Sequence, residues 1–318
     1  MRHLVHWDDA SRVRREIGEI AAWMTDLGTA AGSVAVGLRR WETDPDRRNT
    51  PPHAHGAEEE VFYVLAGSGL LWQDGEVCEV SAGDCIVHLA DEEAHTLKAG
   101  PDGLDVLAFG MREYVETCYH PHSRRAWAGA TIVAADGPGD MFAFDAEAGP
   151  LRWAAPGQRF ANVVNAADVE ELESGEGDCG SVWRHVGAAA GAVRTNLNIG
   201  RCAPGKLQYP PHCHSAEEEL FVVLEGSGSL ELTPSPRQAG YGAEKSEHEV
   251  RRGTVVSRPA GTGIAHTFRA GSKGLTLLAY GTRDPNDICY YPRSGKISWR
   301  GAGLIGRIEH VDYWDGED

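Results

Sequence analysis

Basic residues are scarce in this chain of 318 residues. It has 30 lysines and arginines against 47 aspartates and glutamates, which gives a formal net charge of −17. Proteins that bind nucleic acid need a basic surface, and an acidic surface repels phosphates and anionic lipids. Neither nucleic acid nor a membrane surface is therefore an expected partner.

Long apolar runs are also missing. The sequence has no stretch of about 18 apolar residues, so no transmembrane helix is predicted. The first nine residues, MRHLVHWDD, lack the apolar centre of a signal peptide. The seven cysteines are odd in number and include no Cys-x-x-Cys pair, which favours a reducing compartment over a disulfide framework. These absences together predict a cytoplasmic protein.

What the sequence does contain is an internal repeat. The segment PPHAHGAEEEVFYVLAGSG at 51–69 recurs as PPHCHSAEEELFVVLEGSG at 210–228, an offset of 159 residues. Further on, HTLKAG at 95–100 recurs as HTFRAG at 266–271, an offset of 171 residues. Repeats of this length indicate a duplicated domain.

The second copy thus carries 12 additional residues, the difference between the two offsets. They fall between Leu232 and Glu249, where proline, glycine and charged residues predict a lengthened hairpin loop. We place the boundary between the copies near residue 160, because prolines and glycines cluster just before it. The predicted domains are 1–160 and 161–318.

Both copies show the pattern of β-strands. Short runs of β-branched and aromatic residues, such as EVFYVL at 60–65, are separated by glycine, proline and aspartate. They predict an all-β fold of small barrels or jelly rolls. A helix is expected only for Ser11 to Met24, where apolar residues recur at helical spacing.

Each copy holds residues of the types that bind metal ions. His53 and His55 are separated by one residue, so in a strand both imidazoles lie on one face. Glu60 has the parity of Phe62, which directs its carboxylate into the barrel, and His95 completes the set. The second copy repeats the pattern with His212, His214, Glu219 and His266.

Three imidazoles and one carboxylate suit Fe(II), Mn(II), Ni(II), Cu(II) or Zn(II), with positions left for water or substrate. We therefore expect up to two divalent transition-metal ions per chain, and the choice of metal stays open. The neighbouring carboxylates are expected to be surface charges, with Glu58 as the rival ligand to Glu60; they are Glu58, Glu59, Glu217 and Glu218.

With these motifs the chain resembles the cupin superfamily, in particular a bicupin of the cupin 2 conserved barrel type. The first cupin motif, His-x-His followed by Glu and Gly, ends at Gly67 in the first copy and at Gly226 in the second. The second motif, a Pro-x-Gly turn before the third histidine, is present at 259–266 but absent from 87–95. The resemblance implies two tandem jelly-roll β-barrels from an internal duplication.

The resemblance leaves the reaction open. Quercetinase-like dioxygenases have the same double set of three histidines and one glutamate. Oxalate decarboxylases carry an arginine shortly before the histidine pair, where this chain has Thr50 and Tyr209. The leading hypothesis is therefore a metal-dependent dioxygenase, an oxidoreductase acting on an aromatic or enol-type small molecule, with Glu60 or Glu219 leaving the metal to act as general base.

Two alternatives remain beside the dioxygenase. One is a metal-dependent decarboxylase or isomerase of a small acid or sugar, and the other is a non-catalytic cupin that binds metal or a small ligand. Aromatic walls would favour an aromatic substrate, whereas an inward arginine or lysine would favour a small carboxylate. The expected partner in each case is a small molecule, and a homodimer stays open.

We expect the two barrels to be unequal. The second keeps Pro259, Gly261 and Gly263 beside its third histidine, where they allow a close turn. The first has an acidic run at 91–93 in this place. The second barrel is therefore expected to be the functional one.

Overall fold

β-Strands dominate the structure, a computed structural model that describes residues 3–128, 131–133, 140–311 and 313–317. The first half contains β1 (Leu4–His6), β2 (Arg12–Ile17), β3 (Ile20–Asp26), α1 (Leu27–Ala30), β4 (Val36–Thr43), β5 (Ala54–His55), β6 (Glu60–Gln73), β7 (Glu76–Ser81), β8 (Asp84–His88), β9 (His95–Met111), β10 (Thr117–His120), β11 (Arg125–Ala128), β12 (Thr131–Val133) and α2 (Met141–Glu147). None of the helices in these ranges, or in the rest of the described chain, is long and apolar enough to span a bilayer.

The second half repeats this order of elements. It contains β13 (Val163–Asn165), a 3-10 helix (Ala166–Asp168), β14 (Leu172–Ser174), β15 (Ser181–Arg184), α3 (Val186–Ala189), β16 (Thr195–Cys202), β17 (Cys213–His214), β18 (Glu219–Pro234), α4 (Pro236–Gly240), β19 (Ser246–Arg251), β20 (Thr254–Arg258), β21 (Ile264–Thr282), β22 (Ile288–Tyr291), β23 (Lys296–Trp299) and β24 (Leu304–Arg307). The additional residues of the second copy form α4 between β18 and β19, as the predicted lengthened hairpin requires.

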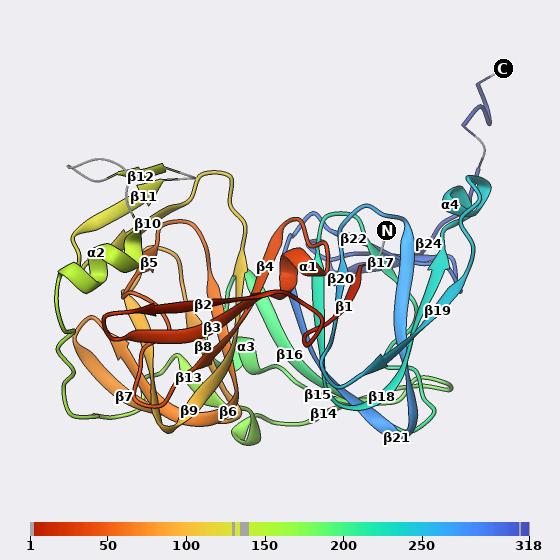
Figure 1. Cartoon of the computed structure of the whole chain (residues 1–318). Helices are drawn as coiled ribbons and strands as arrows, with labels where there is room; N and C mark the ends of the chain where they lie inside the picture. The colour runs from red at the N-terminus through yellow and green to blue at the C-terminus, as the bar shows by residue number, and fades with distance from the viewer. Residues whose placement is uncertain (1–2, 129–130, 134–139, 312, 318) are drawn as a thin grey trace.

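The strands form two jelly-roll barrels that lie side by side (Figure 1). The first barrel has a large sheet of order β13-β8-β6-β9-β4-β3-β2, with β7 on β6, and a smaller sheet of order β12-β11-β10-β5. The second has β1-β20-β18-β21-β16-β15-β14, with β19 on β18, and β17-β22-β23-β24. The predicted all-β fold of two tandem barrels is confirmed.

The two barrels exchange their first strands. β1 pairs antiparallel with β20 of the second barrel, where Leu4 lies opposite Val256. β13, which has the equivalent place in the second copy, pairs with β8 of the first barrel, where Val163 lies opposite Ile86. In Figure 1 the red β1 therefore lies among the strands of the other barrel. Residues just after the predicted boundary at 160 thus complete the sheet of the first barrel, and the N-terminus completes that of the second.

The helix predicted for Ser11 to Met24 is wrong, because these residues form the β2–β3 hairpin. Its turn contains Gly18, whose φ of 53° lies in the left-handed region that glycine adopts without strain. Val13 and Ile17 are exposed on β2, whereas Ile20 on β3 is fully buried. The apolar spacing that resembled a helical face is divided between two strands.

A shared apolar core joins the barrels in addition to the interior core of each. It includes Leu38 and Phe109 from β4 and β9, and Leu278 and Tyr280 from β21. The rings of Phe109 and Tyr280 stack across the interface, with 4.9 Å between their centroids. The barrels therefore form one packed unit.

Two of the glutamates expected to be surface charges are buried between the barrels, which corrects that prediction. Glu59 and Glu218 are each 1 % exposed. The Glu59 carboxylate accepts hydrogen bonds from the backbone N–H groups of Val193 (2.9 Å) and Thr195 (3.0 Å), beyond α3 of the other barrel. The Glu218 carboxylate accepts from the N–H of Val34 (2.9 Å), beyond α1. We name this reciprocal pair of contacts the carboxylate clasp.

Glu217 is also buried, at 2 % exposed, while Glu58 is partly exposed. The Glu217 carboxylate pairs with the Arg300 guanidinium at 2.7 Å. All these partners lie far away in sequence, so the local pattern Ala-Glu-Glu-Glu suggests only a solvated turn.

Replacing Glu59 or Glu218 by glutamine should lower the free energy of unfolding by about 2–3 kcal/mol, since buried N–H groups would face an amide instead of a carboxylate. Urea denaturation of each variant measures this loss. Glu225→Gln, at an exposed position of the second barrel, is the matched control and should change stability by less than about 0.5 kcal/mol. Equal stabilities for all three variants would contradict the clasp.

Candidate metal centres

The predicted ligands of the first copy come together inside the first barrel. Glu60 begins β6 and His95 begins β9, while His53 lies opposite His95 in an isolated bridge and His55 ends β5. From Glu60 Oε2, the Nε2 atoms lie at 3.0 Å for His95 and at 3.6 Å for both His53 and His55. Four potential donor atoms therefore face one point.

The second copy repeats this arrangement inside the second barrel. From Glu219 Oε2, the Nε2 atoms of His266 and His214 lie at 3.0 Å and 3.4 Å. A ring nitrogen of His212 lies within 4.8 Å of donor atoms of Glu219 and His266. The structure thus brings together all eight predicted ligands as two clusters.

The ring orientations leave Nε2 available for a cation. His53 Nδ1 lies 2.9 Å from the carbonyl oxygen of Pro51, and His212 Nδ1 lies 2.9 Å from that of Pro210. A carbonyl only accepts, so each Nδ1 carries the proton and each Nε2 presents its lone pair. Such outer hydrogen bonds are typical of histidines that bind metal ions.

Two carboxylates that the sequence reasoning missed orient the remaining histidine of each pair. Glu116 Oε1 lies 3.1 Å from His55 Nδ1, and Asp287 Oδ2 lies 2.7 Å from His214 Nδ1. Glu116 also accepts a hydrogen bond from the backbone N–H of Gly56 at 3.1 Å. The two positions are related by the repeat offset of 171 residues, so a full alignment of the copies was the signal that pointed to them.

The electrostatics of both clusters call for a cation. Burial alone lowers the pKa of His55, but hydrogen bonds to Glu116 and Glu60 outweigh it and raise the pKa to about 10. Burial likewise opposes the charge of His214, yet Glu219 and Asp287 raise its pKa to about 9. In each cluster an imidazole therefore takes up a proton that a metal ion would displace.

The second cluster also contains unsatisfied donor atoms of the kind a metal ion would satisfy. Nε2 of His214, Nε2 of His266 and Oε2 of Glu219 are buried without a hydrogen-bond partner. Buried polar atoms are normally paired, so three orphaned atoms that face one another need an explanation. The donor set fits a divalent transition metal.

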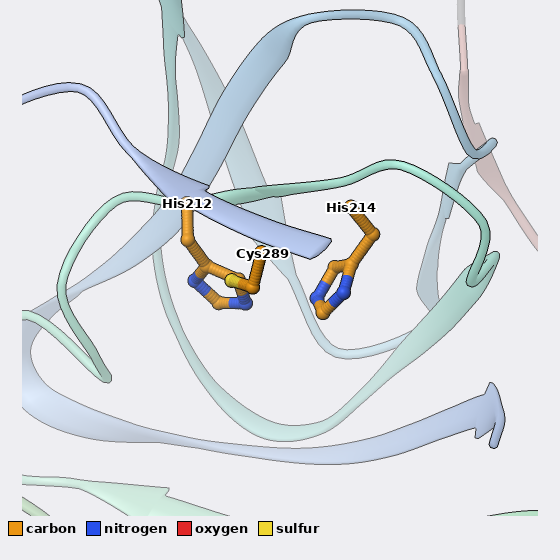
Figure 2. Close-up of side chains that lie close together, drawn as sticks. All are labelled: His212, His214 and Cys289. Atoms are coloured by element: carbon orange, nitrogen blue, oxygen red, sulfur yellow. The ribbon is translucent and has the colours of Figure 1, made fainter. Parts of the chain in front are cut away.

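A cysteine lies beside the second cluster (Figure 2). Cys289 Sγ is within 4.8 Å of ring nitrogens of both His212 and His214. Burial raises the pKa of the Cys289 thiol to about 12, so without a metal ion it stays protonated. Its counterpart in the first barrel, Cys118, contacts His120 instead, with Sγ 3.5 Å from Nε2.

A cavity of about 410 Å³ opens onto the first cluster. Its walls are largely apolar and include Trp41, Phe62, Trp127, Met141 and Phe142. The last two belong to α2, which covers this end of the barrel in Figure 1.

A buried ion pair attaches α2 to the first barrel. Arg48 Nη2 lies 2.6 Å from Asp145 Oδ2, and both residues are 1 % exposed. A buried pair of this kind holds its two elements in one relative position, because separating the charges would leave each uncompensated. The apolar cover of the cavity is therefore fixed in place.

Arg39 and His120 are polar groups in the lining of the same cavity. Arg39 lies on β4 with the parity of Trp41, so it faces inward, and it forms no ion pair with any described residue. The ring of His120 stacks on His53, with 5.8 Å between centroids. Burial and the nearby charges of His53 and His55 lower the pKa of His120 to about 3, so it is a neutral imidazole.

Comparison with known proteins explains why the copies are alike. The family model described as "Cupin domain" matches residues 39–102, and the model described as "Cupin" matches 197–294. A search of curated proteins finds no match.

Several solved structures share the fold across both barrels. Oxalate decarboxylase from Bacillus subtilis at pH 4.6 is 13 % identical, with a TM-score of 0.59 over 88 % of this chain and 76 % of that one. Another structure of that enzyme, solved in a study of its Mn(II) centres, is 12 % identical, with a TM-score of 0.60 over 90 % and 78 %.

The oxalate decarboxylase–formate complex from Lactobacillus farciminis is 15 % identical, with a TM-score of 0.59 over 88 % and 86 % of the two chains. At such identities the likeness shows the fold alone. Two family matches in tandem and two jelly-roll barrels, each with the His-x-His and Glu motif, show that this chain belongs to the cupin superfamily and is a bicupin.

Proposed function

We propose that this bicupin is a metal-dependent enzyme that decarboxylates a small organic acid in its first barrel. The observation that carries the proposal is the cavity over the first cluster, in which the inward Arg39 and the ligand set both line an apolar chamber. An arginine that lacks an ion-pair partner suits the carboxylate of a substrate.

The metal ion would be held by His53, His55, Glu60 and His95, and a second ion by His212, His214, Glu219 and His266. A bound divalent ion would act as a Lewis acid toward an oxygen of the substrate. The identity of the metal stays a proposal, and the Mn(II) centres of the Bacillus subtilis enzyme, which has a similar fold, support Mn(II).

The chain's own residues would bind and orient the acid. Arg39 would donate charge-assisted hydrogen bonds to the carboxylate, and the walls around Trp41 and Phe62 would hold the apolar body and exclude water. In the reaction the bond between carbon and carboxylate breaks, carbon dioxide leaves, and the carbon takes a proton from water.

Glu60 and Glu219 were predicted to act as general bases. Burial opposes their charge, but the surrounding histidines hold the pKa of each carboxylate well below its usual range. Each glutamate is therefore a ligand in this geometry, and a base role requires it to move away from the imidazoles. We keep this role as part of the proposal.

The cavity favours the first barrel over the second as the working site, which revises the expectation from the sequence. The position of Arg39 is taken in the second barrel by Asn198, whose side chain bonds to His185 at 2.7 Å. A volume of about 410 Å³ exceeds what oxalate alone needs. The proposed substrate therefore carries an alkyl or aryl group in addition to its carboxylate.

The aromatic walls favour a second candidate, oxidative cleavage of an aromatic or enol-type molecule by a dioxygenase. Trp41, Phe62 and Trp127 present flat faces against which such a ring would stack. Both candidates use the same ligand set and differ in whether dioxygen is consumed.

The seven cysteines are free thiols in the structure. They support, as a further proposal, a protein of the reducing cytoplasm. The partner we propose is a small molecule.

Protein purified without chelator should carry between one and two transition-metal ions per chain, because two complete ligand sets are present. Elemental analysis measures the content, and chelation should lower the melting temperature since the ion binds only the folded state. His214→Ala should lose more metal than Glu219→Gln, which keeps three imidazoles and an amide oxygen. An absence of metal after reconstitution with each candidate ion would contradict the assignment.

The carboxylates behind the histidines should tune metal affinity. We expect Glu116→Gln to weaken binding at the first cluster, and Asp287→Asn at the second, by roughly 10- to 100-fold, because His55 and His214 lose a charged partner. Competition with a fluorescent chelator measures both constants. Asp284→Asn, a partly exposed change in the same segment as Asp287, should leave them unchanged.

Turnover is tested by supplying aryl and alkyl carboxylic acids and enols to the metal-loaded chain, in air and under nitrogen. Carbon dioxide release without dioxygen supports decarboxylation, whereas dioxygen uptake supports the second candidate. Arg39→Gln should raise KM roughly 10- to 100-fold with a smaller change in kcat, because a charged hydrogen bond to the bound acid is lost. Arg237→Gln, an exposed arginine on α4, is the control. An unchanged KM for Arg39→Gln would remove the carboxylate-binding role.

A further inference from the structure

The two barrels differ at one buried strand position beside their clusters. His88 pairs with Glu60 across β8 and β6, and Arg258 pairs with Glu219 across β20 and β18. Paired side chains lie on the same face of a sheet, so both project into the barrel next to the ligand glutamate. The first barrel thus has an imidazole where the second has a guanidinium.

Arg258 is buried but incompletely satisfied. It is 6 % exposed, and Nη2 donates one hydrogen bond to the carbonyl oxygen of Ile264 at 2.9 Å. Its Nε–H is buried with no hydrogen-bond partner, and it forms no ion pair within the described chain. A buried cation without a paired anion is costly, and a bound anion would remove that cost.

A second orphaned donor lies beside the same cluster. The Tyr209 hydroxyl is buried without a partner, while its ring lies 4.9 Å from that of His212 and 5.8 Å from that of His266, between centroids. The first copy has Thr50 in this place, which satisfies itself with a hydrogen bond to Thr96 or Asn49. The pair of unsatisfied donors therefore belongs to the second barrel.

The balance of charge differs in the same direction. With a divalent ion in each cluster, Glu60 and Glu116 neutralise the first, and burial lowers the pKa of His88 so that it adds no charge. Glu219 and Asp287 neutralise the second in the same way, but Arg258 then leaves one positive charge. Glu217 does not cancel it, because Arg300 already pairs with that carboxylate.

We propose that the second barrel is a binding site for a small carboxylate anion such as formate or acetate. The anion lies between the ligand cluster and β20, where its oxygens accept hydrogen bonds from Arg258 Nε and the Tyr209 hydroxyl. This site is separate from the first-barrel cavity of the proposed function, and neither depends on the other.

The experiment titrates acetate into the metal-loaded full-length chain by isothermal calorimetry. It is done in an Arg39→Gln background, so that carboxylate binding in the first barrel is removed. Arg258→His, which copies the residue of the first barrel, should then weaken acetate binding roughly 10- to 100-fold. Tyr209→Phe should weaken it roughly 3- to 10-fold, since one neutral hydrogen bond is lost.

Three results would overturn the proposal. They are an absence of acetate binding once Arg39 is replaced, an unchanged affinity in the Arg258→His chain, and an unchanged affinity in the Tyr209→Phe chain. Metal content and circular dichroism are measured for every variant. Should Arg258→His fail to fold, Tyr209→Phe decides alone, because it alters neither charge nor ring packing. A failure of the proposed decarboxylation leaves these titrations unaffected.

Discussion

The carboxylate clasp between the barrels is the contact on which the geometry of both clusters depends. Glu59 and Glu218 each precede a ligand glutamate, and successive residues of a strand face opposite sides. When Glu59 is fixed to backbone N–H groups of the second barrel, Glu60 must point into the first. The same relation holds for Glu218 and Glu219. Each barrel thus helps to orient the ligand glutamate of the other.

The sequence was sufficient for the fold and the ligand sets because both depend on local spacing. His53 and His55 share a face by strand parity alone, and the repeat shows the same set twice. The clasp, the cavity and the partners of the histidines depend on residues more than 50 positions away, such as Glu116 for His55. The helix failed for a related reason, since one glycine turn at Gly18 divided an apolar pattern between two strands.

The duplication has kept the ligands and changed their surroundings. Around the first cluster stand the inward Arg39 and the apolar side chains of α2, and around the second stand the buried Arg258 and Tyr209. The ligand sets have the same chemistry, so any difference in what the barrels bind must come from these surrounding residues. Their charges differ most where β8 and β20 meet the ligand glutamates.

The exchange of β1 and β13 also bears on how such a chain can arise. A single barrel made from one repeat would present an edge at β8 or β20 and a free first strand that fits the same edge of an identical barrel. Two such chains would satisfy each other about a twofold axis. Joining them in one polypeptide then requires only a connection between the end of one copy and the first strand of the next. The segment from β12 to β13 makes that connection here, so the fused chain retains the contacts of a strand-swapped dimer within a single molecule.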